Sequence, residues 1–306
     1  MCIAAWIWQA HPVYELLLLL NRDEYHNRPA KPLGWWEWEE DNKKILGGRD
    51  ELAGGTWLGC TEEGRLAFLT NVREPDRLPD ARTRGDLPLR FLKVLYVNMG
   101  KILHTCCFAC GSSDNLIFIC HFVYLKGTKS PLEYAEEIVE EADQYNGFNL
   151  ILTDLCSKVM VYISNRPKGE PISVQTVPSG LHVISNGKLD APWPKAQRLG
   201  KNFDEFLREH GKKDISLKGM VEELMGDNVK ANRDELPDTG VNPEWEFELS
   251  SIFIDTDTKL GRYGTRSMAA ISVKTNGDSI FYEKHLESSL WKENNVKFHV
   301  KKLQHI

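Results

Sequence analysis

The sequence lacks long hydrophobic runs and a secretory signal. No apolar stretch approaches the ~20 residues that a membrane-spanning helix needs, so we expect no transmembrane helix. The chain opens with Met1-Cys2-Ile3 and soon reaches Glu15, whereas a secretory signal has a basic start and an apolar stretch of roughly 7 to 15 residues. We therefore expect a cytoplasmic protein.

The sequence also lacks a basic cluster. Lysine and arginine number 38 against 44 aspartate and glutamate residues, the net charge is -6, and no run of five or more basic residues occurs. A nucleic-acid-binding surface is usually strongly basic. We therefore expect no nucleic-acid partner.

The cysteines form neither a disulfide framework nor a metal motif. Their number, seven, is odd and their spacing irregular, which is typical of free thiols in a reducing compartment. The pattern from His104 to His121 does not form paired C-x2-C knuckles, so we predict no metal site. No C-x-x-C-H motif for covalent haem attachment occurs, so any contact with haem would be noncovalent.

The composition and the order of the predicted elements indicate one globular α+β domain over residues 1–306. Hydrophobic residues make up 42% of the chain and charged residues 27%, enough for a substantial core, and no linker divides the chain. Strands and helices come in blocks, which favours antiparallel sheets over a parallel doubly wound sheet. We expect hairpins of 2–9 with 13–21, 55–60 with 65–71 and 147–153 with 159–165, a hairpin turn at 275–278, and further strands at 181–185 and 251–255. We expect helices at 87–98, 132–143, 193–210 and 217–225, and a loop at 226–244.

The first hairpin brings the N-terminus to a polar cluster. Pairing about the turn at 10–12 sets residues opposite each other when their numbers add to about 23, which places Cys2 level with Asn21. Trimming of Met1, which precedes a small residue, would give Cys2 both a thiol and a free α-amine. The pKa values of these groups lie near 8.5 and about 7.7 to 8, so the amine can accept the thiol proton. The alternative is a buried cysteine that acts as a small apolar residue.

The cluster Asn21-Arg22-Asp23-Glu24 directly follows an apolar strand. Arg22 could lower the thiol pKa or hold a substrate carboxylate or carbonyl, and Asp23 could orient the α-amine. The alternative is an exposed salt-bridge cluster that contributes little energy.

Two further segments have a functional and a structural interpretation. Gly47-Gly48 and Gly54-Gly55 lack the Lys-Ser/Thr of a phosphate-binding loop, so we expect tight turns, with Arg49 and Asp50 forming an ion pair in the pocket wall. Trp35 and Trp36 could stack on a porphyrin or an acyl chain, or could pack in the core or at its rim.

Several motifs carry a family resemblance. Besides Met1-Cys2 and Asn21 to Glu24 they are Gly47-Gly48-Arg49-Asp50, Ala53 to Gly59, Thr70 to Arg73, Thr83 to Leu87, Gly147 to Leu150, Ser164 to Arg166, Ser185 to Gly187, Leu189 to Lys195 and Tyr263 to Arg266. Together they resemble the transport-and-Golgi-organisation-2 family, also named the NRDE family. The segment at about 99–124 departs from that family as an atypical insertion.

The resemblance implies an N-terminal nucleophile hydrolase-like fold, a four-layer αββα sandwich with two antiparallel sheets. By motif position, the candidate catalytic residues that it implies are Cys2, Arg22, Asp23, Asn71, Asn186 and Arg266. We assign a ligand cleft to Asn21, Glu24, Trp35 and Trp36. An Asn amide at a developing oxyanion contributes roughly 2.7 to 4 kcal/mol in favourable cases.

The resemblance also implies a function. The first expectation is an intracellular trafficking protein that binds or transfers haem, acyl-CoA or another lipid, supports Golgi and mitochondrial homeostasis, makes transient contact with organelle membranes and requires no cofactor. The alternative is an active N-terminal cysteine amidohydrolase or thioesterase that uses Cys2 on amide or thioester bonds. A third interpretation is a structural partner of the trafficking machinery, which predicts no saturable binding of a small molecule.

Overall fold

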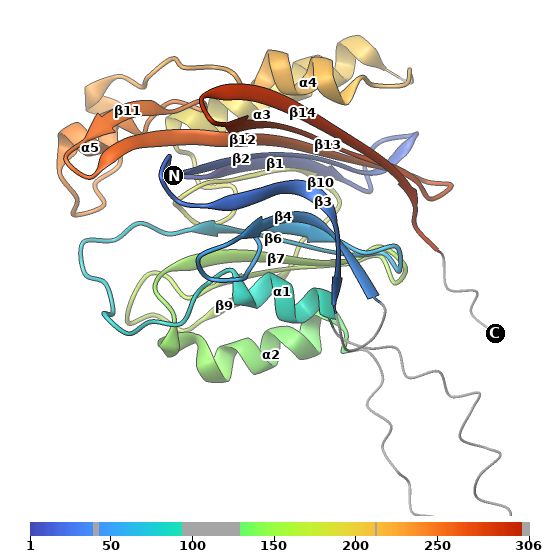
Figure 1. Cartoon of the computed structure of the whole chain (residues 1–306), viewed down its shortest axis with the longest axis horizontal. Coiled ribbons are helices and arrows are strands. Elements are labelled where there is room, and N and C mark those ends of the chain that lie inside the picture. The colour runs from blue at the N-terminus through green and yellow to red at the C-terminus, as the bar shows by residue number, and fades with distance from the viewer. Residues whose placement is uncertain (39–42, 94–128, 212, 302–306) are drawn as a thin grey trace, which may run out of the picture.

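The structure is a computed structural model that describes residues 1–38, 43–93, 129–211 and 213–301. Two antiparallel sheets, each of seven strands, stack face to face, and helices cover the outer face of each sheet (Figure 1). This four-layer αββα sandwich confirms the fold class that the sequence predicts. The predicted insertion at 99–124 lies outside the described residues.

The first sheet contains the first and the last of the described strands. Its strands lie in the order β10-β1-β2-β12-β13-β14, and β11 pairs with β12. The bounds are β1 Ile3–Trp8, β2 Tyr14–Tyr25, β10 Gly180–Ile184, β11 Asp255–Thr258, β12 Gly261–Lys274, β13 Asp278–Glu287 and β14 Leu290–His299.

The second sheet follows chain order from β3 to β9. Its strands are β3 Ala30–Trp38, β4 Lys43–Asp50, β5 Leu58–Cys60, β6 Arg65–Asn71, β7 Phe148–Asp154, β8 Val159–Ser164 and β9 Ser173–Thr176. The predicted hairpins β5–β6 and β7–β8 are confirmed.

The helices pack by their apolar faces. They are α1 Asp86–Lys93, α2 Pro131–Glu141, α3 Pro194–His210, α4 Leu217–Leu224 and α5 Pro243–Glu248. Helix α2 begins at a capping box in which Ser130 and Glu133 bond each other's backbone N–H, as predicted. Helices α3 and α4 cover the first sheet, and α1 and α2 cover the second (Figure 1). None of the described helices is long and apolar enough to cross a membrane.

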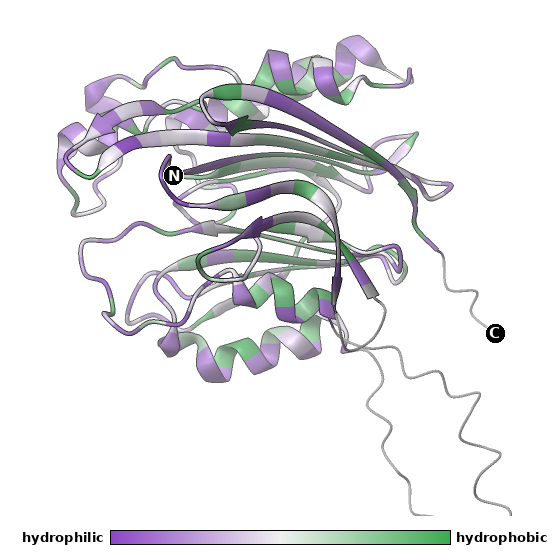
Figure 2. Cartoon of the chain, in the orientation of Figure 1, coloured by the Kyte–Doolittle hydropathy of each residue, from purple (hydrophilic) through white to green (hydrophobic). Residues whose placement is uncertain are grey.

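Strand β2 shows why the centre of the fold is so apolar. Leu16, Leu18 and Leu20 point into the core between the sheets, whereas Leu17 and Leu19 point into the core beneath α3 and α4. Both faces of the strand are therefore buried, which explains its continuous hydrophobic sequence (Figure 2). Each buried leucine contributes roughly 1.5 to 3 kcal/mol relative to an exposed one.

The segment before β11 differs from the prediction. A strand was expected at 251–255, but residues 251–254 form no strand and β11 begins at Asp255. Their carbonyls instead accept side-chain hydrogen bonds: Lys195 Nζ donates to Ser251 O at 3.4 Å and Asn21 Nδ2 donates to Ile252 O at 3.0 Å. The predicted loop at 226–244 also contains a short 3-10 helix at Arg233–Glu235 and the first residues of α5.

Candidate functional site

The register of the first hairpin differs from the prediction by one residue. Ile3 pairs with Asn21 and Ala4 with Leu20, so the residue numbers of opposite partners add to 24, whereas the prediction was 23. Extending this register places Cys2 level with Arg22. Since alternate residues of a strand face opposite sides, Arg22 points toward the space between the sheets and Asn21 points the other way.

Asn21 consequently lies outside the pocket that contains Cys2. Its side chain is fully buried, and its Nδ2 donates to Met225 O at 2.9 Å and to Ile252 O at 3.0 Å. These bonds attach the end of α4 and the segment before β11 to the first sheet. Asn21 therefore holds backbone segments together and does not line the Cys2 pocket.

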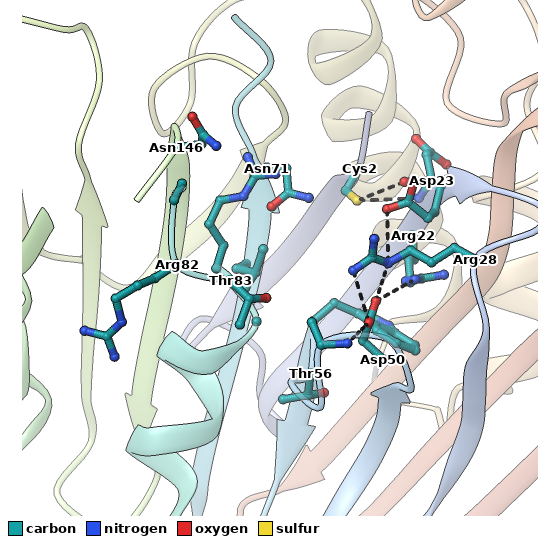
Figure 3. A pocket seen from close by; sticks show the side chains of 17 residues that line it. Cys2, Arg22, Asp23, Arg28, Asp50, Thr56, Asn71, Arg82, Thr83 and Asn146 are labelled. Carbon is teal, nitrogen blue, oxygen red and sulfur yellow. Dashed lines mark hydrogen bonds and ion pairs between the residues drawn. The ribbon is translucent and has the colours of Figure 1, made fainter. Parts of the chain in front are cut away.

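A pocket of about 280 Å³ opens at the end of β2. Its walls are Cys2, Arg22, Asp23, Glu24, Arg28, Asp50, Ala53, Thr56, Trp57, Leu69, Asn71, Ala81, Arg82, Thr83, Arg84, Gly85 and Asn146. Figure 3 shows Asn71 across the pocket from Cys2 and Asp23. The structure therefore brings together five of the predicted site residues: Cys2, Arg22, Asp23, Glu24 and Asn71.

The Cys2 thiol contacts the backbone of Asp23. The Asp23 N–H donates to Cys2 Sγ at 3.5 Å, and the thiol lies 3.9 Å from Asp23 O. Burial raises the pKa of the Cys2 thiol, and the nearby Asp23 carboxylate raises it further. The thiol is therefore protonated at neutral pH when Met1 is present.

The Asp23 carboxylate holds the N-terminus. Its Oδ2 lies 3.0 Å from the Met1 α-amine, and Thr265 Oγ1 donates to its Oδ1 at 2.7 Å. The Met1 amine also donates to the hydroxyl of Tyr263 at 2.6 Å. Burial lowers the pKa of this amine, while the Asp23 carboxylate opposes that change. Asp23 thus orients an N-terminal amine, here that of Met1.

The Met1 side chain occupies an apolar site beside the pocket rather than the pocket itself. The residue is 5% exposed, its side chain packs with Leu249, Ile254, Trp193, Trp245 and Tyr263, and it is absent from the walls of the Cys2 pocket. A retained methionine therefore leaves the thiol facing the cavity.

Lys195 fixes the Met1 backbone. Its Nζ donates to Met1 O at 3.2 Å and to Leu249 O at 3.0 Å, and burial lowers the pKa of Lys195 to about 8. This lysine ends the Pro192-Trp193-Pro194-Lys195 motif, but its sequence context gave no indication of a role beside the N-terminus.

The Arg22 guanidinium stacks on the Trp57 ring and shares the Asp50 carboxylate with Arg28. Its guanidinium lies 4.2 Å from the centre of the Trp57 ring and 3.6 Å from Asp50 Oδ2. Arg28 Nε also binds Asp50 Oδ2, at 2.5 Å. Burial alone would raise the pKa of Asp50, but the hydrogen bonds from Arg28 and the Ala53 N–H lower it below its ordinary value. Asp50 thus stands in the pocket wall as predicted, but it pairs with these two arginines and not with Arg49.

Arg28 and Trp57 were not predicted as site residues. Arg28 lies just beyond the Asn21 to Glu24 cluster, and Trp57 lies in the Ala53 to Gly59 motif. Arg28 meets Arg22 through Asp50 of the second sheet, and Trp57 stacks on Arg22 across the two sheets, so both contacts depend on sheet packing that no local pattern encodes.

Four of the six candidate catalytic residues carry an amide or a guanidinium group. Of these four, Arg22 and Asn71 line the pocket, whereas Asn186 and Arg266 do not. Asn186 instead accepts from the Arg73 N–H at 2.6 Å and donates to Arg73 O at 3.4 Å. Arg266 Nη1 donates to Tyr25 O at 3.2 Å and to Arg28 O, and it lines a separate small cavity behind Arg22 and Trp57. Asn186 and Arg266 thus support the neighbouring backbone.

The two tryptophans of the predicted ligand cleft lie on opposite faces of the second sheet. Trp35 packs against the core between the sheets, with its ring centre 6.1 Å from that of Phe298. Trp36 packs against the core beneath α1 and α2, with the Arg49 guanidinium 5.2 Å from its ring centre. Neither residue lines the pocket, and their surroundings match the core-packing alternative.

A metal centre is not formed by the residues that the structure describes, since they contain no group of three or more His, Cys, Asp or Glu side chains suited to hold an ion. The cysteines between His104 and His121 lie outside the described residues.

Known proteins resemble the chain along nearly its whole length. The sequence model described as Transport and Golgi organisation 2 matches residues 1–104 and 118–288. The Transport and Golgi organization 2 homolog of Mus musculus is 30% identical, over 97% of this chain and 99% of the mouse protein. The Transport and Golgi organization protein 2 of Drosophila melanogaster is 22% identical, over 92% and 91%.

Two solved structures match the chain at low similarity. The C2A mutant of a conjugated bile acid hydrolase from Clostridium perfringens has a TM-score of 0.38, with 12% identity over 100% of both chains. The Caenorhabditis elegans ortholog of N-acylethanolamine-hydrolyzing acid amidase has a TM-score of 0.36, with 13% identity over 73% of this chain and 85% of that chain. The family match and the mouse relative settle the classification: the chain belongs to the Transport and Golgi organisation 2 family.

Proposed function

We propose that the protein acts in intracellular trafficking by binding or transferring an amphipathic small molecule, haem or an acyl-CoA or other lipid, at the Cys2 pocket. The observation that carries the proposal is the pocket's wall, which places several guanidinium groups beside the apolar surfaces of Trp57 and Leu69. Haem and acyl-CoA both combine anionic groups with an apolar body. Membership of the Transport and Golgi organisation 2 family supports the trafficking part of the proposal.

The size of the pocket limits how such a ligand binds. A volume of about 280 Å³ is close to the lower end of the roughly 300–1,000 Å³ typical of small-molecule sites. The pocket would therefore hold one end of a haem or an acyl-CoA, and the rest would extend beyond it. Transient contact with an organelle membrane would supply or receive that apolar remainder.

The pocket wall favours recognition of anionic groups over ligation of iron. Among the described wall residues no histidine occurs, and Cys2 is the sole thiol. Because burial raises the pKa of that thiol, it is a poor iron ligand at neutral pH. Haem would accordingly bind noncovalently through its carboxylates.

Binding measurements test this function. We expect saturable quenching of tryptophan fluorescence by haemin or by palmitoyl-CoA, because Trp57 lines the pocket. A Cys2→Ala variant should bind as tightly as the wild-type chain if the protein is a carrier. Absence of saturable binding of either ligand would overturn the proposal and would favour a structural partner of the trafficking machinery.

A second candidate function is an N-terminal cysteine amidohydrolase or thioesterase. It is favoured by the convergence of the Cys2 thiol, the Asp23 carboxylate and the Asn71 amide on one pocket. After removal of Met1, the Cys2 amine would take the thiol proton and the sulfur would attack the substrate carbonyl. The Asn71 amide would stabilise the oxyanion, the leaving group would take a proton from the ammonium, and water would then hydrolyse the thioester.

The two functions make different predictions for Cys2→Ala. Release of free CoA from palmitoyl-CoA, or of amine from an N-acyl amide, should disappear in this variant if the protein is a hydrolase. Unchanged ligand binding with no turnover in either protein would support the carrier and exclude hydrolysis of these substrates.

A further inference from the structure

Four guanidinium groups line the Cys2 pocket, and three of them have carboxylate partners. Arg22 and Arg28 share Asp50, at 3.6 and 2.5 Å, and Arg28 also lies 3.8 Å from the Glu24 carboxylate. Arg82 binds Glu141 at 2.7 Å and Asp86 at 3.1 Å. These three positive charges are therefore compensated within the protein.

Arg84 differs from the other three. Its Nη1 donates to the uncharged carbonyl of Gly147 at 2.8 Å, and no carboxylate among the described residues lies within ion-pair distance of it. Glu74, one of the nearest acids, already accepts two hydrogen bonds from Arg166. Burial lowers the pKa of Arg84 to about 10, with Arg77 acting in the same direction, so the guanidinium remains charged at neutral pH.

The backbone holds Arg84 firmly in the pocket wall. Thr56 N–H donates to Gly85 O at 3.0 Å, and Leu87 N–H donates to Arg84 O at 3.1 Å, where α1 begins. The two loops touch so closely that a Cβ atom added at Gly55 would lie 2.4 Å from the Gly85 carbonyl carbon. Little backbone ordering would therefore be needed when a ligand binds.

We infer that Arg84 binds an anionic group of the ligand, a carboxylate or a phosphate, and so determines the preference of this pocket for anionic over neutral amphiphiles. The inference rests on the proposed function and names its ligand class. A guanidinium with one hydrogen bond to a carbonyl keeps further N–H groups that match the two oxygens of a carboxylate or phosphate. Such an anion would complete the charge balance that Asp50 and Glu141 provide for the other arginines.

Arg82 offers a matched control for the test. It lies two residues away and lines the same pocket, but it points away from Cys2 and is neutralised by Glu141 and Asp86 (Figure 3). Arg84→Gln and Arg82→Gln each remove one positive charge at nearly the same place. General electrostatic attraction would be weakened equally by both, whereas a direct contact would be lost only in the first.

The experiment compares dodecanoate, dodecyl phosphate and dodecanol by calorimetric titration of the wild-type chain and both variants, with far-UV circular dichroism to verify folding. We expect Arg84→Gln to bind the two anionic probes roughly 10- to 100-fold more weakly, the range lost with a charged hydrogen bond, and to bind dodecanol unchanged. Arg82→Gln should bind all three probes within about threefold of the wild-type chain. A larger loss for dodecyl phosphate than for dodecanoate would assign the site to phosphate, and the reverse to carboxylate.

Two results would overturn the inference in distinguishable ways. Equal binding of the anionic probes by the wild-type chain and folded Arg84→Gln would overturn the role of Arg84 and leave the proposed function standing. Failure of the wild-type chain to bind any of the probes, together with haemin and palmitoyl-CoA, would overturn both.

Discussion

The backbone N–H of Asp23 donates to the Cys2 sulfur at 3.5 Å, while the carboxylate of the same residue lies 3.0 Å from the N-terminal amine. One residue thus positions both groups that an N-terminal nucleophile needs. In the chain that retains Met1, however, the amine belongs to Met1. Because Met1 is 5% exposed, an aminopeptidase can reach it only before the chain folds.

Removal of Met1 should increase the reactivity of Cys2. With Met1 present, burial raises the pKa of the thiol, so little thiolate is available at pH 7. Trimming opens the apolar site beside Cys2 and transfers the free amine to Cys2 itself. We expect iodoacetamide to alkylate Cys2 at least about tenfold faster in the trimmed chain.

Intact-mass measurement separates the two forms, and peptide mapping follows Cys2 alone. Cys60 provides an internal control, because it is buried in the core between the sheets in either form and should stay unlabelled. Equal alkylation rates at Cys2 in the two forms would contradict the expected effect of trimming.

The parts of the fold that the sequence predicts well are those with local chemical signals. The capping box at Ser130 and the turn at Asn276-Gly277 need only neighbouring residues, and both form as predicted. The first hairpin is also present, but its connection places Gln9 at a φ of 49° and shifts the register by one residue. That shift reverses the face on which Asn21 lies, which sequence alternation alone does not determine.

Arg266 is a second residue whose side-chain direction the sequence does not determine. The pairing of β12 with β2 contains an irregularity between Thr265 and Ser267, so Arg266 has no direct partner in the ladder. A bulge redirects a side chain and interrupts the alternation from which its direction would be predicted. The motif therefore identifies the residue near the site but not the backbone carbonyls that it binds.

Lys195 should make stability depend on pH. Its pKa is about 8 in the folded protein against an ordinary value of 10.5, so between these pH values the unfolded chain binds more protons. The cost of burying the charge is complete below pH 8 and is relieved as pH rises toward 10.5. We expect the wild-type free energy of unfolding, relative to that of Lys195→Met, to rise by up to about 3 kcal/mol from pH 7 to 10.

Urea unfolding at both pH values measures this difference. Lys201→Met serves as a control, since the Lys201 side chain is 74% exposed and should give a pH-independent difference from the wild-type chain. A Lys195→Met curve parallel to the wild-type curve between pH 7 and 10 would contradict the prediction.

Asn21→Ala should reduce stability without changing ligand affinity. The substitution leaves the carbonyls of Met225 and Ile252 without their donor in the interior, at a cost of about 2 to 4 kcal/mol. Urea unfolding measures the loss, and palmitoyl-CoA titration of the folded variant measures binding. Asn228→Ala, at an exposed position, should change stability by less than about 0.5 kcal/mol. Weaker binding of palmitoyl-CoA by folded Asn21→Ala would contradict this prediction and would support a place for Asn21 in the ligand cleft.

Asn71 should show the opposite behaviour to Asn21. Its Oδ1 is buried without a hydrogen-bond partner among the described residues, an arrangement that costs folding energy. Asn71→Ala removes this unsatisfied atom, so we expect the free energy of unfolding to stay constant or to increase. If the pocket is a hydrolase site, kcat for palmitoyl-CoA should fall about 100- to 1,000-fold, the effect of losing one oxyanion donor.

The comparison with Asn186→Ala makes the Asn71 prediction specific. Asn186 lies outside the pocket and bonds the Arg73 backbone at 2.6 and 3.4 Å, so its loss should lower stability and leave kcat within about threefold. Parallel urea unfolding and turnover measurements on the two variants separate the alternatives. A stable Asn71→Ala protein with normal kcat would remove Asn71 from the catalytic proposal, and an unstable one would assign it a structural role. The stability change and kcat together thus decide whether this amide is placed for folding or for chemistry at Cys2.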